Sequence, residues 1–264
     1  MHRRRVHRVV PVARAAPRRR PGSLLWAGVL LLSLGLLAAG RLPAAVIMEH
    51  RVDEAALAGL GVAAPVAREA LAVGRDAWHR ADYALARRWL RVAAEAGEAE
   101  AQYLLGMIYD AGHGLPAPDA VRAAAWYRRA ARAGHAGAQH NLGAAYLAGD
   151  GVPRDVAAAL RWWHRAAAGG SVDAQFNLGV IYALGRYGVR PDMKRALHWW
   201  RRAAILGDPM AQYNLGTLYA NGDGPVRSYC EAQRWWERSA AKGVTQAALA
   251  LQILRARPDY TGCR

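Results

Sequence analysis

The sequence predicts an all-α solenoid of stacked antiparallel helix pairs, and three features that recur together lead to this prediction. An Ala-Gln pair opens successive copies, beginning at Ala101, Ala138, Ala174 and Ala211. A Leu-Gly pair follows with the same period of 36 or 37 residues, beginning at Leu105, Leu142, Leu178 and Leu215. So does an aromatic pair, beginning at Trp126, Trp162, Trp199 and Trp235. Self-similarity at such a period is typical of a solenoid, in which each unit needs its neighbours to bury its hydrophobic faces.

The first helix of each copy is predicted from the spacing of its apolar residues. In the copy from 138 to 170, Ala138, Leu142, Ala145 and Tyr146 follow the i, i+4, i+7, i+8 pattern of one buried helix face. The Gly-Asp-Gly sequence at 149–151 then ends this helix in a turn.

The second helix of each copy is predicted to start at an N-cap and end before a C′ glycine. The N-cap residues are Asp119, Asp155, Asp192 and Ser228, the last forming a capping box with Glu231. The glycines are Gly134, Gly170, Gly207 and Gly243. The buried face is expected to include Ala159, Trp162 and Ala166 with Trp163 beside them. The aromatic pairs are expected to pack between neighbouring hairpins. The alternative is stacking on a carbohydrate, which would need the second aromatic residue of each pair to be partly exposed (Tyr127, Trp163, Trp200 and Trp236).

These copies resemble the Sel1-like repeat, a relative of the tetratricopeptide repeat. The matching segments are AQYLLGMIY…AAAWYRRAARAG, AQHNLGAAY…ALRWWHRAAAGG, AQFNLGVIY…ALHWWRRAAILG and AQYNLGTLY…AQRWWERSAAKG. The resemblance implies a right-handed superhelix that makes protein–protein contacts, usually without catalysis of its own. The four expected repeats are 98–134, 135–170, 171–207 and 208–243.

The ends of the solenoid are expected to differ from its middle, because terminal repeats cap the stack. Residues 65–97 form an atypical, tetratricopeptide-like copy with a tight turn at 81–83 in place of the glycine-rich loop. Residues 244–264 are expected to form a capping helix followed by an irregular tail. Residues 41–64 are expected to form a stalk that precedes the repeats.

The N-terminal region predicts a membrane anchor. Residues 1–21 form a basic tail with eight arginines and no acidic residue, and the uncharged apolar segment 22–40 is almost long enough to cross a bilayer. The positive-inside rule places this tail in the cytoplasm and the repeats outside the inner membrane, in the periplasm of a bacterium. A cleaved signal peptide is the alternative, and it would release the repeats into the periplasm.

Charge and cysteine content bear on partners and compartment. The formal net charge is +16, and half of it comes from the arginines of the N-terminal tail. A basic soluble part favours acidic partners or anionic surfaces, although the same arginines could simply solvate the outer helix faces. Cys230 and Cys263 predict a disulfide that ties the C-terminal tail to the last repeat, as in exported domains. Two unrelated thiols, or an intermolecular bond through Cys263, are the alternatives.

Two ladders of polar side chains are the candidate functional residues. Because first helices line the concave face in the Sel1-like family, Asn141, Asn177 and Asn214 are predicted to line a peptide-binding groove there, where amides can pair with a bound backbone. The alternative is that each asparagine forms hydrogen bonds within its own repeat and so supports the fold. A secondary surface is expected on the outward side of the second helices, formed by Arg129, Arg165, Arg202 and Arg238.

The sequence offers little support for catalysis. The match of Ser239–Lys242 to an S-x-x-K motif falls on a packing position of the repeat, and no K-T-G follows. No cofactor, metal site or nucleic-acid partner is expected. We therefore expect a non-catalytic, membrane-anchored periplasmic scaffold that binds an unidentified protein partner in the cell envelope. The alternatives are a module that binds peptidoglycan or another anionic envelope polymer and, less favoured, a β-lactam hydrolase.

Overall fold

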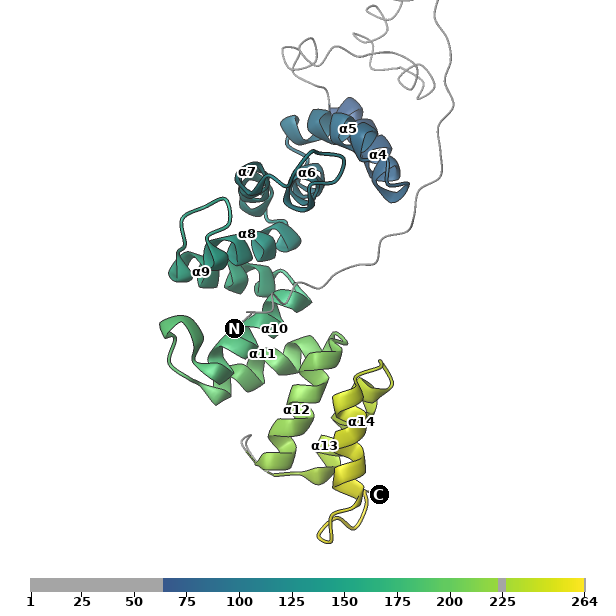
Figure 1. The fold of residues 1–264 in the computed structure, drawn as a ribbon, viewed down its shortest axis with the longest axis vertical. Coiled ribbons are helices and arrows are strands. Elements are labelled where there is room, and N and C mark those ends of the chain that lie inside the picture. The colour runs from purple at the N-terminus through teal and green to yellow at the C-terminus, as the bar shows by residue number, and fades with distance from the viewer. Residues whose placement is uncertain (1–63, 223–226, 264) are drawn as a thin grey trace, which may run out of the picture. The chain divides into compact units, whose positions relative to one another are not determined.

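The computed structural model describes residues 64–222 and 227–263, and within them every regular element is helical. Figure 1 shows the helices in chain order. The N-terminal pair is α4 and α5, and a single 3-10 turn at Arg186–Gly188 follows α10. The helices are α4 (Ala64–His79), α5 (Tyr83–Glu95), α6 (Ala99–Ala111), α7 (Ala120–Arg132), α8 (Ala136–Ala148), α9 (Val156–Ala168), α10 (Val172–Leu184), α11 (Met193–Ile205), α12 (Pro209–Asn221), α13 (Tyr229–Ala240) and α14 (Thr245–Arg255).

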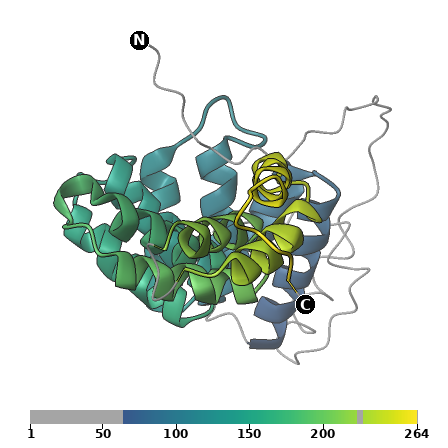
Figure 2. The same ribbon diagram turned by 90° about the horizontal axis from the view of Figure 1, so that it is seen from below.

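The helices pack as a solenoid of antiparallel pairs. Each helix contacts the next one in the chain, first within a copy and then across the boundary to the following copy. The view in Figure 2, turned by 90°, shows the same arrangement of paired helices. The predicted all-helical solenoid of paired helices is confirmed.

The predicted membrane anchor falls in the N-terminal part of the chain, which the structure does not describe. The basic tail, the apolar segment 22–40 and the stalk up to residue 63 lie outside the described residues. Within the part that the structure describes, none of the helices has the length and apolar character needed to span a bilayer.

The ends of the second helices follow the predicted capping chemistry. The carboxylates of Asp119, Asp155 and Asp192 accept hydrogen bonds from the backbone N–H three residues later, at 2.9 Å in each case. The glycines that follow these helices have φ values of +85° to +95°, a conformation that side-chain-bearing residues rarely adopt. Ser228 caps α13 through Glu231 N–H, but the Glu231 carboxylate pairs with Arg234 instead of completing the capping box.

The recurring Leu-Gly and aromatic pairs are explained by one contact inside each copy. A Cβ atom on Gly179 would lie 2.3 Å from Cδ1 of Trp200, and the corresponding glycines approach the second aromatic residue of their own copies equally closely. The second aromatic residues are therefore the buried ones, with exposed fractions of 3–7% (Tyr127, Trp163, Trp200 and Trp236).

The predicted order of burial within the aromatic pairs is therefore wrong. The buried stripe of α9 runs through Ala159, Trp163, Ala166 and Ala167, at i, i+4, i+7 and i+8. Trp162 precedes this stripe by one residue, about 100° around the helix, and is only half-buried. The first aromatic residue thus lies at the edge of the core, and the second fills it.

The recurring Ala-Gln pair connects each copy to the one before it. The glutamine side chains are buried, and their Nε2 atoms donate to carbonyls in the last turn of the preceding helix at 2.9–3.1 Å. Each of these carbonyls also accepts from the backbone N–H of the glycine that follows the helix, at 3.0–3.2 Å, so each glutamine adds a side-chain donor to it. The pairs are Gln102 with Ala94, Gln139 with Ala131, Gln175 with Ala167 and Gln212 with Ala204.

A second set of contacts joins each second helix to the first helix of the next copy. Arg201 donates to the Tyr219 hydroxyl at 2.6 Å, and equivalent contacts join Arg91 to Tyr109 and His164 to Tyr182. At the C-terminal end, Glu237 and Arg255 occupy these two positions and form an ion pair at 3.5 Å. In this contact α13 carries the acidic group and α14 carries the basic group, and the ion pair holds the capping helix to α13.

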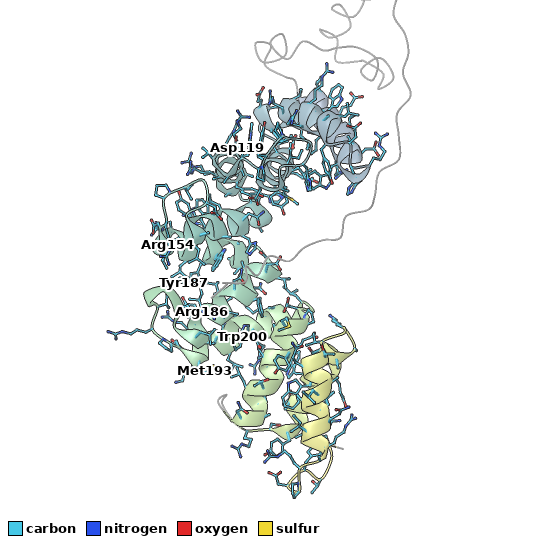
Figure 3. All side chains as sticks on the ribbon, viewed as in Figure 1. Asp119, Arg154, Arg186, Tyr187, Met193 and Trp200 are labelled. Atoms are coloured by element: carbon cyan, nitrogen blue, oxygen red, sulfur yellow. A yellow bond between two sulfur atoms is a disulfide. The ribbon has the colours of Figure 1, made fainter. Side chains whose placement is uncertain are left out.

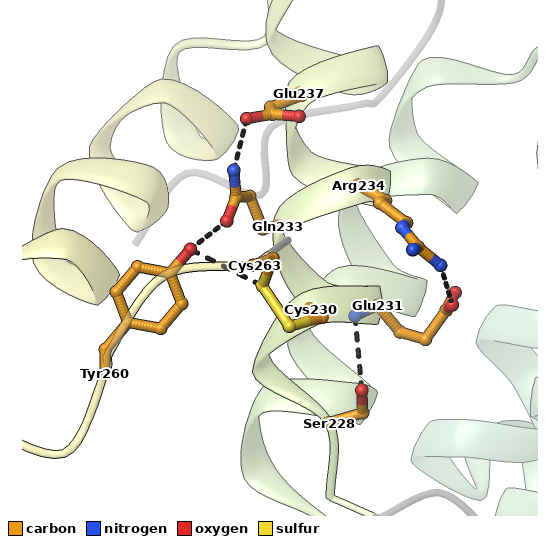
Figure 4. The surroundings of a disulfide bond; sticks show 8 residues. All are labelled: Ser228, Cys230, Glu231, Gln233, Arg234, Glu237, Tyr260 and Cys263. Carbon is orange, nitrogen blue, oxygen red and sulfur yellow. Dashed lines mark hydrogen bonds and ion pairs between the residues drawn. A yellow bond between two sulfur atoms is a disulfide. The ribbon is translucent and has the colours of Figure 1, made fainter.

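The disulfide between Cys230 and Cys263 is formed, as predicted (Figure 4). It joins the first turn of α13 to the C-terminal tail, 33 residues later in the chain. The hydroxyl of Tyr260 donates to Gln233 on α13 beside this bond. The tail is thus fastened to the last repeat by covalent and polar contacts together.

Candidate functional site

The first helices of neighbouring copies approach one another directly. Helix α4 contacts α6, and α6 contacts α8, whereas no two second helices within the described residues come as close. The first helices therefore line the inner side of this part of the stack. We define the first-helix face by two positions that recur along it: Tyr103, His140, Phe176 and Tyr213 at one, and Leu104, Asn141, Asn177 and Asn214 at the other.

His140 connects two of the predicted asparagines. Its Nδ1 atom lies 3.2 Å from Asn141 Oδ1, and its Nε2 atom lies 3.0 Å from Asn177 Nδ2 in the next copy. One proton arrangement satisfies both contacts: Nδ1–H donates to Asn141, and Nε2 accepts from Asn177. This arrangement requires a neutral imidazole. Burial lowers the pKa of His140, only partly opposed by the Asp173 carboxylate.

A second polar contact reaches this face from Tyr127 on the second helix α7. Its hydroxyl donates to the Asp110 carboxylate at 3.2 Å and also interacts with Asn141. Burial, followed by the charge of Asp110, raises the pKa of Tyr127 far above its ordinary value. Asn141 is therefore held by both its neighbour on the same helix and the second helix of the preceding copy.

Asn214 differs from the other two asparagines. It is half-buried, and no described residue makes a hydrogen bond with its amide. At the other end of the ladder, Leu104 is buried and apolar. Asn141 and Asn177 thus hold the copies together, while Asn214 is the amide that remains available to a partner. Sequence spacing alone could not separate these roles, because the difference depends on His140.

The first-helix face continues into the capping helix α14. Leu249 follows Tyr213 by 36 residues and so occupies one of the two positions that define the face, and Ile253 lies one helical turn further along α14. Their exposed fractions are 56% and 59%. The C-terminal end of the face therefore combines a free amide with exposed aliphatic side chains. An alignment of α14 with the first helices of the repeats would have predicted these aliphatic residues from the sequence.

The four arginines of the predicted secondary surface are exposed, and Arg129 also donates to the Ala94 carbonyl at 3.3 Å. Each guanidinium carbon lies over the ring of the half-buried tryptophan three residues before it, at 4.6–5.4 Å from the ring centroid. The pairs are Arg129 with Trp126, Arg165 with Trp162, Arg202 with Trp199 and Arg238 with Trp235. The second aromatic residues, by contrast, are buried and do not present a flat ring to a carbohydrate.

The side chains of Ser239 and His135 both serve to pack and cap the helices. Ser239 is fully buried, and its hydroxyl donates to the Pro209 carbonyl at 2.7 Å. His135 caps α8 by accepting from Ala138 N–H, and its ring stacks on Tyr103 at 4.4 Å. Among the described residues, no group of three His, Cys, Asp or Glu side chains is arranged to hold a metal ion.

A family model described as the Sel1 repeat matches residues 56–98, 99–135, 136–171, 172–208 and 209–244. No curated protein matches the chain.

Two solved structures resemble the chain over most of its length. One is a protective antigen of uropathogenic Escherichia coli strains that displays an SLR fold, with a TM-score of 0.67 and 30% identity. That match covers 71% of this chain but only 41% of the antigen, so this chain spans less than half of its length. The other is a Sel1 repeat protein from Oxalobacter formigenes, with a TM-score of 0.64, 28% identity, and coverage of 74% of this chain and 80% of that one. Since five successive repeats match the family model, the chain belongs to the Sel1 repeat family.

Proposed function

We propose that this chain is a non-catalytic scaffold of the bacterial cell envelope that binds a protein partner on its first-helix face. Sel1 repeat proteins typically act as scaffolds for protein–protein interactions. Two observations carry the proposal: the free amide of Asn214 on α12, and the exposed aliphatic residues Leu249 and Ile253 on α14. A row of half-buried aromatic and imidazole side chains extends this surface along the preceding copies.

The chemistry of the face favours an extended segment with apolar and neutral side chains. Helices α6, α8, α10 and α12 contain no Lys or Arg, so the face offers few charges to pair with a strongly acidic partner. An asparagine amide can donate to and accept from a bound backbone at the same time. The aliphatic residues of α14 provide apolar area that a partner would remove from water.

The proposed location is the periplasmic side of the inner membrane, with the apolar segment 22–40 as the anchor. The basic N-terminal tail supports this orientation through the positive-inside rule. The Cys230–Cys263 disulfide supports export, because disulfides persist in oxidising compartments. Anchoring raises the concentration of the scaffold near membrane-bound partners.

The face can be tested with matched variants of one helix. Asn214→Ala removes the free amide, whereas Asn221→Ala changes an exposed asparagine at the end of the same helix α12. We expect a protein that copurifies with the full chain after crosslinking in cells to be lost with Asn214→Ala and with Leu249→Ser, and to be retained with Asn221→Ala. Equal retention by all three variants contradicts the proposed face.

The location is tested separately with a topology reporter fused after Arg264. A periplasmic signal is expected from the intact chain. A cytoplasmic signal would overturn the proposed orientation without affecting the binding face.

A further inference from the structure

Charges differ between the first helices and three of the second helices, whereas the second helix of the last repeat, α13, carries both signs. The second helices α7, α9 and α11 carry ten Lys and Arg residues and no Asp or Glu. The first helices α6, α8, α10 and α12 carry three acidic residues and no Lys or Arg. The cations are Arg122, Arg128, Arg129, Arg132, Arg161, Arg165, Lys194, Arg195, Arg201 and Arg202.

Six of these cations lie on one repeating exposed surface. On each of the three second helices, four positions spaced i, i+4, i+8 and i+11 are exposed, on the side opposite the buried alanines and aromatic residues. We call these twelve positions the outer face: Val121, Ala125, Arg129, Arg132, Ala157, Arg161, Arg165, Ala168, Lys194, His198, Arg202 and Ile205. No acidic residue occupies any of them.

The acidic residues nearest in sequence leave most of these cations unneutralised. Asp119 and Asp192 pair with Arg122 and Arg195, neither of which belongs to the outer face. Within the described residues, Arg161 alone of the outer-face cations has an ion-pair partner, Asp155, at 3.9 Å. A pair that long and that exposed contributes little, so the positive potential of the outer face persists.

Large aliphatic side chains accompany the cations. Val121 on α7 is 67% exposed, and Ile205 and Leu206 at the end of α11 are 69% and 57% exposed. At the boundaries after α7 and α9, the two positions of Ile205 and Leu206 hold only Arg, Ala or Gly. The half-buried tryptophans under Arg129, Arg165 and Arg202 add amphipathic rings to the same side of the second helices.

We propose that the outer face binds the surface of a lipid bilayer that contains anionic phospholipids. Lipid phosphates attract clustered Lys and Arg, exposed aliphatic side chains enter the boundary with the acyl chains, and tryptophan is favoured at the interface. An acidic protein or a soluble polyanion would satisfy the cations but would leave the exposed Val121, Ile205 and Leu206 without a role.

This inference rests on the proposed function only in that the anchor would keep the repeats beside a bilayer. With the outer face on the membrane, the first-helix face points away from the lipid and stays open to a protein partner. Binding at one face therefore does not exclude binding at the other.

The experiment uses the full chain with Trp26→Phe, which removes the tryptophan of the apolar segment. The protein is reconstituted with vesicles of brominated phosphatidylcholine, with or without phosphatidylglycerol, and the quenching of tryptophan fluorescence is measured. We expect strong quenching only with phosphatidylglycerol, and we expect it to fall as salt increases because the attraction is screened. Flotation with the neutral vesicles reports on the anchor independently of quenching.

The matched variants carry equal changes in charge. Replacing Arg129, Arg165 and Arg202 with Gln removes three outer-face cations, whereas Arg154→Gln, Arg186→Gln and Arg190→Gln together remove three from exposed loops. Figure 3 labels Arg154 and Arg186 in these loops, where Arg154 lies over the Tyr187 ring at 5.7 Å. At roughly a factor of five for each cation near a lipid surface, the outer-face triple variant should weaken the association about a hundredfold and abolish quenching.

The remaining outcomes decide the proposal. Retained quenching in the outer-face variant, or equal loss in the loop variant, overturns it. The proposal is also overturned if lipid quenching is absent and the chain shows salt-dependent binding to polyglutamate or to purified sacculi. That result would identify a polyanion other than lipid as the partner. If the chain fails to float with neutral vesicles but is quenched by anionic ones, the anchor proposal fails and the lipid-binding proposal stands.

Discussion

Substituting Gly179 with Ala tests the contact that defines each repeat. The new Cβ atom would lie 2.3 Å from Cδ1, 2.4 Å from Nε1 and 2.8 Å from Cγ of Trp200. These atoms belong to a rigid ring with an exposed fraction of 7%, so the indole must shift as a unit or the two helices must separate. Overpacking of a core typically costs about 1–3 kcal/mol. The gain in helix propensity from Gly to Ala returns at most about 1 kcal/mol.

We therefore expect Gly179→Ala to lower the free energy of unfolding by about 1–2 kcal/mol. The assay is chemical unfolding followed by circular dichroism, with tryptophan fluorescence to detect displacement of the buried indole. The matched control is Gly169→Ala, since Gly169 has φ of −75° and its new Cβ would lie 3.3 Å from the Ala136 methyl group and 3.5 Å from the carbonyl oxygens of Arg165 and Ala166. If Gly179→Ala is as stable as the control, the proposed packing of the Leu-Gly and aromatic pairs is wrong.

Three further predictions concern contacts that hold the copies together. Gln175→Met removes the side-chain donor to the Ala167 carbonyl, which keeps its hydrogen bond from Gly170 N–H, and should cost about 0.5–1.5 kcal/mol in chemical unfolding; no change would show that the glutamine hydrogen bond does not stabilise the stack. Replacing Cys230 and Cys263 with Ser should cost about 3–4 kcal/mol in the chain-entropy model, and thermal unfolding that is unaltered by the double variant or by reductant would contradict a stabilising disulfide. Burial lowers the pKa of His140, so just below the ordinary histidine pKa of about 6.5 the unfolded state binds more protons than the folded state. The stability that neutral His140 contributes should therefore be fully present above this pH and should fall as the pH drops below it. His140→Gln should make that fall less steep in unfolding measured across this range, and an identical slope would contradict the role assigned to His140.

The repeat architecture could be predicted because its signals are local and recur. The N-cap residue Asp155, the C′ glycine Gly170 and the Leu-Gly pair each stay in place from copy to copy, and the structure gives them the expected conformations. The phase of the second helix was harder to predict. Trp162 and Trp163 are both large and apolar, and only the approach of Gly143 to Trp163 shows which ring enters the core.

The candidate site was predicted less completely, because its contacts cross repeat boundaries. Asn141, Asn177 and Asn214 have the same spacing, but their roles depend on His140, which has Phe176 and Tyr213 at its position in the next two copies. The structural glutamines were missed for a similar reason. Gln175 makes its hydrogen bond to a residue of the preceding copy, and the carbonyl that accepts it has no sequence signal.

The arginine ladder was predicted from its spacing, but its surroundings were not. The predicted ladder was the set of four arginines including Arg165. The structure adds the half-buried tryptophan beneath each guanidinium and the exposed Val121 and Ile205 among them. These neighbours suggest a lipid surface where charge alone suggested any anionic partner.

Site-specific photocrosslinking in cells tests the central claim most directly. A photoreactive amino acid is placed at position 214 or 249 on the first-helix face, or at Ala125 or Ala157 on the outer face. We predict protein adducts from the first two positions and none from the outer-face positions. Protein adducts that form at Ala125 and Ala157 but not at 214 or 249 would contradict the account, because the partner would then bind the second helices.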